Sequence, residues 1–260
     1  MQNRRSFLNA AITALASSYA SSLRANPSKK HVIILVEGAG DFQAVSKVLE
    51  KSLKKFPNNA ELQMFHWSHG YLRVVRDQTD LGNISENGQK LAGTIRLMLK
   101  RDPSLDVTVL SHSAGTAVAL NGVSLLNDNT IRKLVLLAPS VSKDYPIIPS
   151  LTACKEGVHV FYSKDDTFIL GPIMRVVKTA DNIRDTVAAG RFGFSPKLRD
   201  NVEEILAARR LRQYAWKPED KDLGNDGGHY GSYGQPYFDE KVLPIVLGQK
   251  PETQMTSNTP

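Results

Sequence analysis

The sequence predicts an α/β fold in which a mainly parallel sheet carries helices on both faces. Short apolar runs of strand type alternate along the chain with longer segments whose apolar residues recur at helical spacing. The 260 residues, 41% of them hydrophobic, are enough for one domain with a sizeable buried core. Neither a metal ion nor a disulfide is then needed to hold the fold together.

The expected elements follow one another in the order that such a sheet requires. Apolar runs indicate strands at residues 31–36, 62–67, 107–110, 131–137 and 158–162. Helical spacing indicates helices at 41–56, 84–100, 114–126 and 237–247. Asp41 is the expected N-cap of the first helix, and Pro244 is expected to kink the last one. Residues 168–216 show no regular pattern.

Residues 1–25 are expected to be an export signal rather than part of the fold. Arg4 and Arg5 precede an apolar stretch, 8–23, that is too short and too rich in Ala and Ser for a stable membrane span. The Arg-Arg-Ser-Phe-Leu segment resembles the twin-arginine export signal of bacteria. The resemblance implies passage through the export machinery to the periplasm or the medium. A chance arginine pair on a frayed terminus is the alternative. Small residues offer cleavage sites at Ser18, Ala20 and Ala25.

The charge balance argues against a nucleic-acid partner. The chain has 33 basic and 26 acidic residues, and loss of Arg4, Arg5 and Arg24 with the signal leaves 30 against 26, a net charge of +4. Lys51, Lys54 and Lys55 cluster on one expected helix, where a solvated face is the simpler interpretation. We expect no nucleic-acid interaction.

The rest of the chain is expected to form one folded unit. Residues 26–249 make up this domain, and the polar tail 250–260 is expected to be disordered. The single cysteine, Cys154, cannot form an intramolecular disulfide and is expected to be a small buried hydrophobic residue.

The strongest chemical signal is the segment Leu-Ser-His-Ser-Ala-Gly that ends at Gly115. A serine hydroxyl needs a base, an acid that orients the base, and donors for the developing oxyanion. A sharp strand-to-helix turn presents such a serine, and only small residues fit two positions before and after it. Ser111 and Gly115 occupy these positions around Ser113, so Ser113 is the candidate nucleophile. A serine that merely caps a helix is the alternative.

In this context the segment Ser-His-Ser-Ala-Gly resembles the Gly-His-Ser-x-Gly turn of esterases and lipases of the α/β-hydrolase superfamily, and the resemblance covers residues 31–247. It implies the α/β-hydrolase fold, lacking much of an N-terminal hairpin. It also implies a serine hydrolase that cleaves an ester or related acyl bond through an acyl-enzyme, with no cofactor and no metal. The superfamily's chain order is serine, then an acid after a later strand, then a histidine near the C-terminus.

The chain supplies a candidate acid and base in that order. The loop that begins at Ser163 resembles the superfamily's Gly-x-x-Asp-x-x-Val loop, which selects Asp166 and leaves Asp165 as the alternative. A helix N-cap is the simpler role for either carboxylate. His229 lies in a glycine-rich loop before the last helix, where the superfamily carries its base. The other histidines fit less well: His31 and His159 in strands, His112 with a side chain expected to point away from the serine, and His66 and His69 at a strand end.

The resemblance also assigns the oxyanion hole to backbone N–H groups. One belongs to Ala114, directly after the nucleophile, and the second comes from the loop after the first strand, at Gly38, Ala39 or Gly40. Small residues there let the backbone approach a substrate oxygen. Glu37 stands where many relatives carry histidine, and its carboxylate would disfavour an oxyanion if it were aimed at it.

The substrate is expected to be a small-molecule or lipid-like ester. The segment 140–151 carries only Lys143 and Asp144 as charges, which cancel. Together with 168–194 it could form a lid over an apolar acyl pocket, although the same side chains could equally belong to the core. The candidates are Ile147, Ile148, Phe168, Ile169, Phe192 and Phe194.

Two other interpretations of the sequence are alternatives to a serine hydrolase. Gly38-Ala39-Gly40 follows a strand, as in a dinucleotide-binding loop, but Gln43 stands where the third glycine of that fingerprint should be. A non-catalytic binding protein with the hydrolase fold is the second alternative, because a fold does not fix a function.

Overall fold

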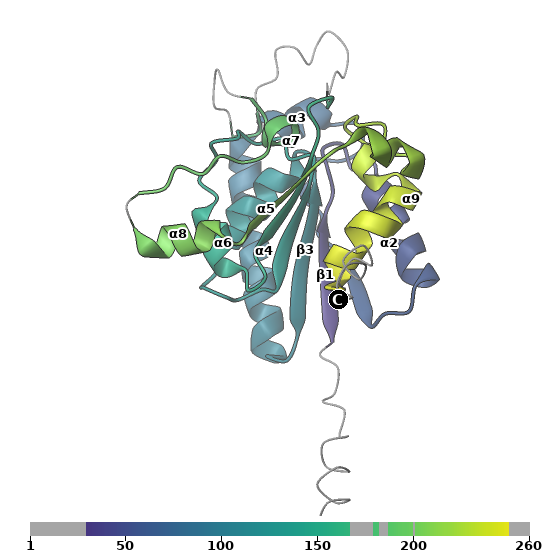
Figure 1. Cartoon of the computed structure of the whole chain (residues 1–260). Helices are drawn as coiled ribbons and strands as arrows, with labels where there is room; N and C mark the ends of the chain where they lie inside the picture. The colour runs from purple at the N-terminus through teal and green to yellow at the C-terminus, as the bar shows by residue number, and fades with distance from the viewer. Residues whose placement is uncertain (1–29, 167–178, 182–186, 200, 250–260) are drawn as a thin grey trace, which may run out of the picture.

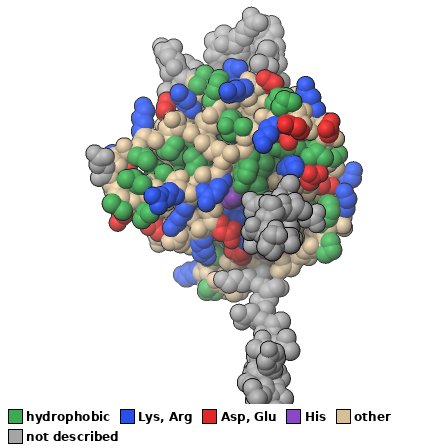
Figure 2. All heavy atoms as spheres, viewed as in Figure 1, with side chains coloured by type: hydrophobic (Ala, Val, Ile, Leu, Met, Phe, Trp, Pro, Cys, Tyr) green, Lys and Arg blue, Asp and Glu red, His purple; other side chains and the backbone are tan. Residues whose placement is uncertain are grey.

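The computed structural model describes residues 30–166, 179–181, 187–199 and 201–249. The expected export signal and the expected tail lie outside these residues. Among the helices of the described part, none is both long enough and apolar enough to cross a membrane. On the face drawn in Figure 2, basic, acidic and hydrophobic side chains are interspersed.

A single sheet of six parallel strands forms the centre of the described molecule, in the order β2-β1-β3-β4-β5-β6. The strands are β1 (His31–Val36), β2 (Ala60–Met64), β3 (Asp106–His112), β4 (Lys133–Leu137), β5 (Val158–Tyr162) and β6 (Leu211–Ala215). Every residue of β1 and β4 is buried, because helices cover both faces of the sheet. The predicted fold class is confirmed, and no strand precedes β1 in the described residues.

Helices pack on both faces of the sheet (Figure 1). One face carries α4 (Leu81–Arg101), α5 (Gly115–Ser124) and α6 (Ile148–Ala153), and the other carries α2 (Ala44–Lys55) and the C-terminal helical segment. That segment consists of α9 (Gln235–Tyr237), the π-helical turn η4 (Phe238–Val242) and α10 (Leu243–Leu247). The shorter elements are α3 (Val74–Thr79), α7 (Ala189–Phe192), α8 (Val202–Ala208), η2 (Pro218–Leu223) and η3 (Gly231–Tyr233).

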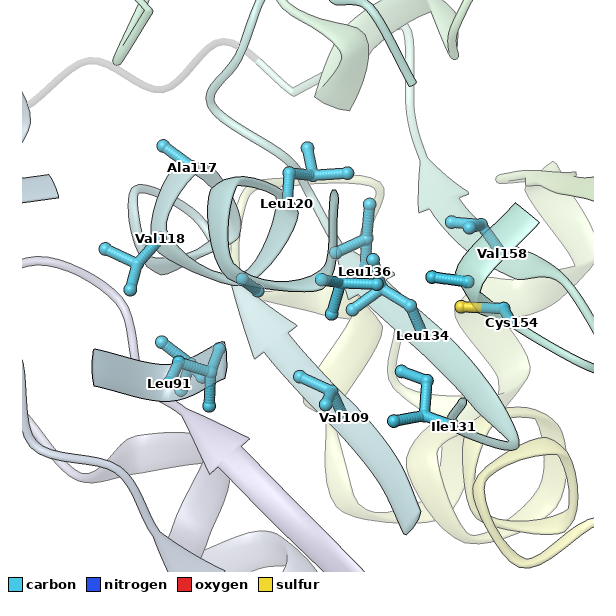
Figure 3. Close-up of a cluster of buried hydrophobic side chains, with 14 of the residues drawn as sticks. Leu91, Val109, Ala117, Val118, Leu120, Ile131, Leu134, Leu136, Cys154 and Val158 are labelled. Carbon is cyan, nitrogen blue, oxygen red and sulfur yellow. The ribbon is translucent and has the colours of Figure 1, made fainter. Parts of the chain in front are cut away.

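Two hydrophobic clusters fill the space between the sheet and its helices. In the larger one, Leu91 of α4 and Leu120 of α5 belong to the same buried cluster as Val109 and Leu136 of the sheet (Figure 3). Cys154 is a free thiol buried in this cluster, as predicted, and burial raises its pKa. The smaller cluster joins the opposite face of the strands to α2 and to the C-terminal helices.

The structure corrects several predicted boundaries. The first helix begins at Ala44 with Gln43 as its N-cap, so the prediction of Asp41 was wrong. Asp41 has a left-handed backbone (φ 48°), and the Glu37 carboxylate accepts the Ser46 N–H at 2.7 Å in place of a local cap. The last helix accommodates Pro244 through η4, a π-helical turn directly before it. The second strand, β2, ends three residues earlier than predicted.

Several short elements were not predicted, β6, α3 and α8 among them, for physical reasons. The strand β6 is at the edge of the sheet, and its sequence, Leu-Arg-Gln-Tyr-Ala, keeps no buried apolar run. The helices α3 and α8 have only six and seven residues, too few to reveal a helical period.

Candidate active site

The chain crosses the sheet in a way that opens a crevice between β1 and β3. From β1 the chain runs outward to β2, and it then returns to β3 on the other side of β1. In parallel sheets, ligands bind at the carboxyl ends of the strands where the direction of winding reverses. The pairing of Val36 with Ser111 places the loop after β1 beside the turn after β3.

Ser113 occupies the sharp turn between β3 and α5. Its backbone is left-handed (φ 52°), a strained conformation for a residue other than glycine. Its N–H donates to the Leu137 carbonyl at 3.0 Å, which holds the turn against the end of β4. Gly115 is required two residues later because a Cβ there would lie 2.1 Å from the Glu37 carbonyl oxygen.

Ser111 fills the position where the superfamily usually has glycine. The side chain is fully buried, and its hydroxyl donates to the carbonyl oxygen of Val36 at 2.9 Å. The hydroxyl therefore joins β3 to the end of β1, and the departure from glycine is accommodated by a hydrogen bond.

The structure brings three of the predicted site residues into hydrogen-bond contact. Ser113 Oγ lies 2.8 Å from His229 Nε2, and His229 Nδ1 lies 2.9 Å from Asp166 Oδ2. All three side chains are buried, although they come from positions 53 and 63 residues apart in the chain. The alternative acid, Asp165, is exposed to solvent.

A second hydroxyl lies beside Ser113. Ser140, after β4, places its Oγ 3.2 Å from Ser113 Oγ, and its N–H donates to the Ser113 carbonyl at 3.3 Å. When the Ser113 proton is directed at His229, the Ser140 hydroxyl is the donor of this pair. Nothing in the sequence singles out Ser140 except its position at a strand end.

His112 contacts His229. The two rings lie 4.9 Å apart, and His112 Nε2 is 3.3 Å from the His229 carbonyl oxygen. Burial, and to a smaller extent the neighbouring His229, lowers the pKa of His112 well below 6.5. A neutral His112 donates its Nε2–H to that carbonyl and so supports the loop that carries His229. The expectation that the His112 side chain points away from Ser113 did not include this contact with His229.

The candidate oxyanion donors differ in what their N–H groups bind. The Gly40 N–H donates to Asp77 Oδ2 at 2.8 Å, and the Gly38 N–H is among the donors that counteract the raised pKa of Glu37. The N–H groups of Ala39 and Ala114 have no acceptor among the residues that the structure describes. These two donors remain available to a substrate oxygen.

Glu37 is directed to the start of α2. Burial raises the pKa of its carboxyl, and the N–H groups of Ser46 and Val45, with the Ser46 hydroxyl, oppose that rise. A carboxylate at a helix N-terminus is favoured by the helix dipole. Because these hydrogen bonds direct the Glu37 carboxylate to α2, it is less able to disfavour an oxyanion beside Ser113.

Asp77 is a buried carboxylate that the sequence did not single out. Its side chain is fully buried, and Oδ2 accepts the Gly40 N–H at 2.8 Å and the Ser68 hydroxyl at 2.6 Å. Oδ1 accepts the His69 N–H and contacts His69 Nδ1, each at 2.8 Å. Asp77 therefore connects the loop after β1 to the loop after β2, the first of which carries Ala39.

The remaining histidines have other environments. His31 Nε2 lies 2.9 Å from the Thr108 hydroxyl, and burial lowers the pKa of His31 and of His159 to about 4. His66 is exposed. His69 lies between Asp77 and Asp80.

A hollow opens beside Ser113 and His229. Its apolar lining comes from the loop after β1, from α2 and α3, and from the loop of His229. The predicted lid residues do not line it: Ile147 and Phe194 are buried in the larger core, Ile148 packs against that core, and Phe192 is exposed. Phe168 and Ile169 lie outside the described residues. Of the two possibilities that the sequence left open, the structure supports the core for Ile147 and Phe194.

The described residues contain no group of three or more His, Cys, Asp or Glu side chains that could hold a metal ion.

The sequence matches a family model over residues 11–178, described as "alpha/beta hydrolase of unknown function". The chain belongs to this family. The matched region includes Ser113 and Asp166 and ends before His229. No curated protein matches the chain.

Solved structures with a similar arrangement include three hydrolase-related proteins. A hydrolase of the alpha/beta superfamily from Xanthomonas campestris is 17% identical, with a TM-score of 0.42 over 82% of this chain and 98% of its own. A lipase-esterase related protein from Clostridium acetobutylicum is 14% identical, with a TM-score of 0.46 over 85% and 96%. The catalytic core domain of acetyl xylan esterase from Trichoderma reesei is 10% identical, with a TM-score of 0.45 over 85% and 98%.

Proposed function

We propose that this protein is a serine hydrolase that cleaves a carboxylic ester or related acyl bond through an acyl-enzyme. The observation that carries the proposal is the unbroken series of contacts from Ser113 Oγ to His229 Nε2 at 2.8 Å, and from His229 Nδ1 to Asp166 Oδ2 at 2.9 Å. This geometry gives a weak nucleophile both a base and an acid that fixes the tautomer of that base.

In the first half of the reaction, Ser113 Oγ attacks the carbonyl carbon while its proton passes to His229 Nε2. Asp166 stabilises the imidazolium that forms, because its carboxylate accepts the Nδ1–H. The carbon–oxygen bond to the alcohol then breaks, and His229 returns the proton to the departing oxygen. Water repeats the sequence on the acyl-enzyme and releases the carboxylic acid.

The negative charge on the substrate oxygen is stabilised by the N–H groups of Ala39 and Ala114. Both lack an acceptor in the described part of the chain, whereas the Gly40 N–H is engaged by Asp77. Such donors each contribute about 3–4 kcal/mol to transition-state stabilisation in enzymes of this kind. Two hydrogen bonds position this loop: Asp77 accepts the Gly40 N–H, and the Glu37 carboxylate accepts the Ser46 N–H.

The site of action is proposed to be the periplasm or the medium, through a twin-arginine-like signal at residues 1–25 with the export machinery as partner. Arg4→Lys/Arg5→Lys should retain the protein in the cytoplasm of the producing bacterium, whereas the unchanged chain should be recovered outside it. Recovery of both forms in the same compartment would contradict this assignment.

Single and double substitutions test the mechanism. Ser113→Ala and His229→Ala should each lower kcat for p-nitrophenyl acetate at least about 10⁴-fold, and the double variant should lose little more. Asp165→Asn is the control for Asp166→Asn, because it makes the same change on an exposed neighbour. Full activity of Ser113→Ala would show that hydrolysis does not depend on Ser113, and no hydrolysis by the unchanged protein would favour a non-catalytic binding protein.

A further inference from the structure

The hollow beside Ser113 is lined mainly by apolar side chains. Phe42 and Val74 contribute from one side, and Tyr230 contributes from the loop of His229. Gly40 lies directly beneath the first two: a Cβ there would come within 2.8 Å of both the Phe42 ring and the Val74 side chain. The loop that carries Ala39 therefore lies against these apolar side chains.

The apolar lining continues onto the surface. Tyr71 makes an edge-to-face contact with Phe42, with the ring centroids 5.7 Å apart. Phe42 is 42% exposed and Tyr71 68%, so two large aromatic side chains lie in water at the mouth of the site, and Leu72, the next residue after Tyr71, is 63% exposed. Large apolar side chains grouped at one place on a surface mark a binding site more often than isolated ones do.

The backbone holds this rim in an unfavourable conformation. Leu72 has a left-handed φ of 64°, which a branched aliphatic residue rarely adopts, and its N–H donates to the Gly40 carbonyl at 3.1 Å. Strain of this kind persists where the surrounding structure enforces it, and it concentrates at functional sites. Asp77 joins the loops that carry Phe42 and Leu72, through the Gly40 N–H and the His69 N–H.

The charges of the hollow restrict its occupant further. Glu37 is the one carboxylic acid among its described lining residues, and no lysine or arginine is among them. An anionic group beside the ester would therefore find no cation to pair with.

We infer that the substrate is an uncharged ester whose apolar group, attached directly to the scissile bond, lies against Phe42 and Val74 and extends toward Tyr71. This inference rests on the proposed function, because it places the ester carbonyl at Ser113. The hollow is continuous with the nucleophile, so its occupant is the substrate itself rather than a partner protein.

The test compares p-nitrophenyl acetate, butanoate and hexanoate with the full-length protein. Each methylene that becomes buried should raise kcat/KM about fourfold until the hollow is filled. The p-nitrophenyl monoester of adipic acid, equal in length to the hexanoate but with a terminal carboxylate, should be at least about tenfold poorer than the hexanoate. Methyl to hexyl acetates test an apolar group on the alcohol side in the same way.

Two variants separate the apolar wall from general effects. Phe42→Ala should remove most of the gain with chain length, so that kcat/KM falls far more for the hexanoate than for the acetate. Phe192→Ala is the matched control, because Phe192 is 45% exposed and does not line the hollow. Thermal unfolding of both variants shows whether either one is damaged.

The outcomes distinguish this inference from the proposed function. No dependence on chain length in either series, or the same dependence in Phe42→Ala, overturns the inference while hydrolysis of the acetate sustains the proposed function. No hydrolysis of any ester and no modification of Ser113 by a fluorophosphonate overturn both.

Discussion

Asp77→Asn tests the network that holds the loop after β1. The carboxylate has two acceptor oxygens, one for the Gly40 N–H and the Ser68 hydroxyl, the other for the His69 N–H and ring. Asparagine offers one acceptor oxygen and an NH₂ group that faces a donor on the other side. The Ser68 hydroxyl and the His69 ring can reverse their roles, but a backbone N–H cannot.

The loss is therefore at least one backbone N–H left without an acceptor, at Gly40 or at His69. Asp77 is fully buried, so that N–H has little access to water. An unpaired buried donor costs about 1–3 kcal/mol, and we expect the free energy of unfolding to fall by about 2 kcal/mol. Urea unfolding followed by circular dichroism measures it.

The same variant should lower kcat more than it changes KM. If the Gly40 peptide moves, the adjacent Ala39 N–H moves with it, and loss of one oxyanion donor lowers kcat about 10²- to 10³-fold. A partial displacement should give at least a tenfold decrease. Asp128→Asn is the control, because it makes the same change at an exposed position. Unchanged stability refutes the hydrogen-bond assignment, and lower stability with an unchanged kcat refutes the positioning of Ala39.

Three further predictions follow from buried groups elsewhere. Burial raises the pKa of the Glu37 carboxyl above 4.5, so its ionisation weakens the folded state as the pH rises, and Glu37→Gln should gain stability over the unchanged protein as the pH rises above 4.5. Burial lowers the pKa of His31 from 6.5 to about 4, so its contribution is complete above pH 6.5 and disappears toward pH 4; His31→Gln should remove about 3 kcal/mol of this acid-induced loss in urea unfolding. Gly115→Ala should cost about 3 kcal/mol or more, since a Cβ at 2.1 Å from the Glu37 carbonyl cannot be accommodated, and thermal unfolding measures it.

Matched variants keep these predictions specific. Glu50→Gln and His66→Gln remove the same groups at exposed positions and should leave the pH dependence of unfolding unchanged. Gly93→Ala adds a methyl group where no atom lies within 4 Å, in the middle of α4, and should stabilise the protein by about 1 kcal/mol. Equal behaviour of a variant and its control contradicts the corresponding prediction.

The central strands and the turn at Ser113 could be predicted because their signals are local. A fully buried strand such as β1 is a continuous apolar run, and a small-residue turn between a strand and a helix is visible in a single short segment. The candidates Asp166 and His229 could be named because the resemblance supplies an order along the chain. Their distances from Ser113 depend on three-dimensional packing.

The features that sequence reasoning missed depend on contacts between distant segments. Asp77 looks like one of several loop carboxylates until its donors are known, and Ser140 approaches Ser113 only through the pairing of β3 with β4. The same reason left the expected acyl pocket undecided between a pocket and the core. Ile147 and Phe194 are as apolar as Phe42 and Val74, and composition alone does not distinguish a side chain in the core from one that lines a hollow.

One measurement tests the proposed role of Ser113 most directly: the site at which a fluorophosphonate modifies the full-length protein, located by mass spectrometry. Ser140 provides an internal competitor, because its hydroxyl lies only 3.2 Å from that of Ser113. We predict modification at Ser113 alone, retained in Ser140→Ala and abolished in Ser113→Ala and His229→Ala. Modification at Ser140, or none under conditions in which the protein is folded, would contradict the account.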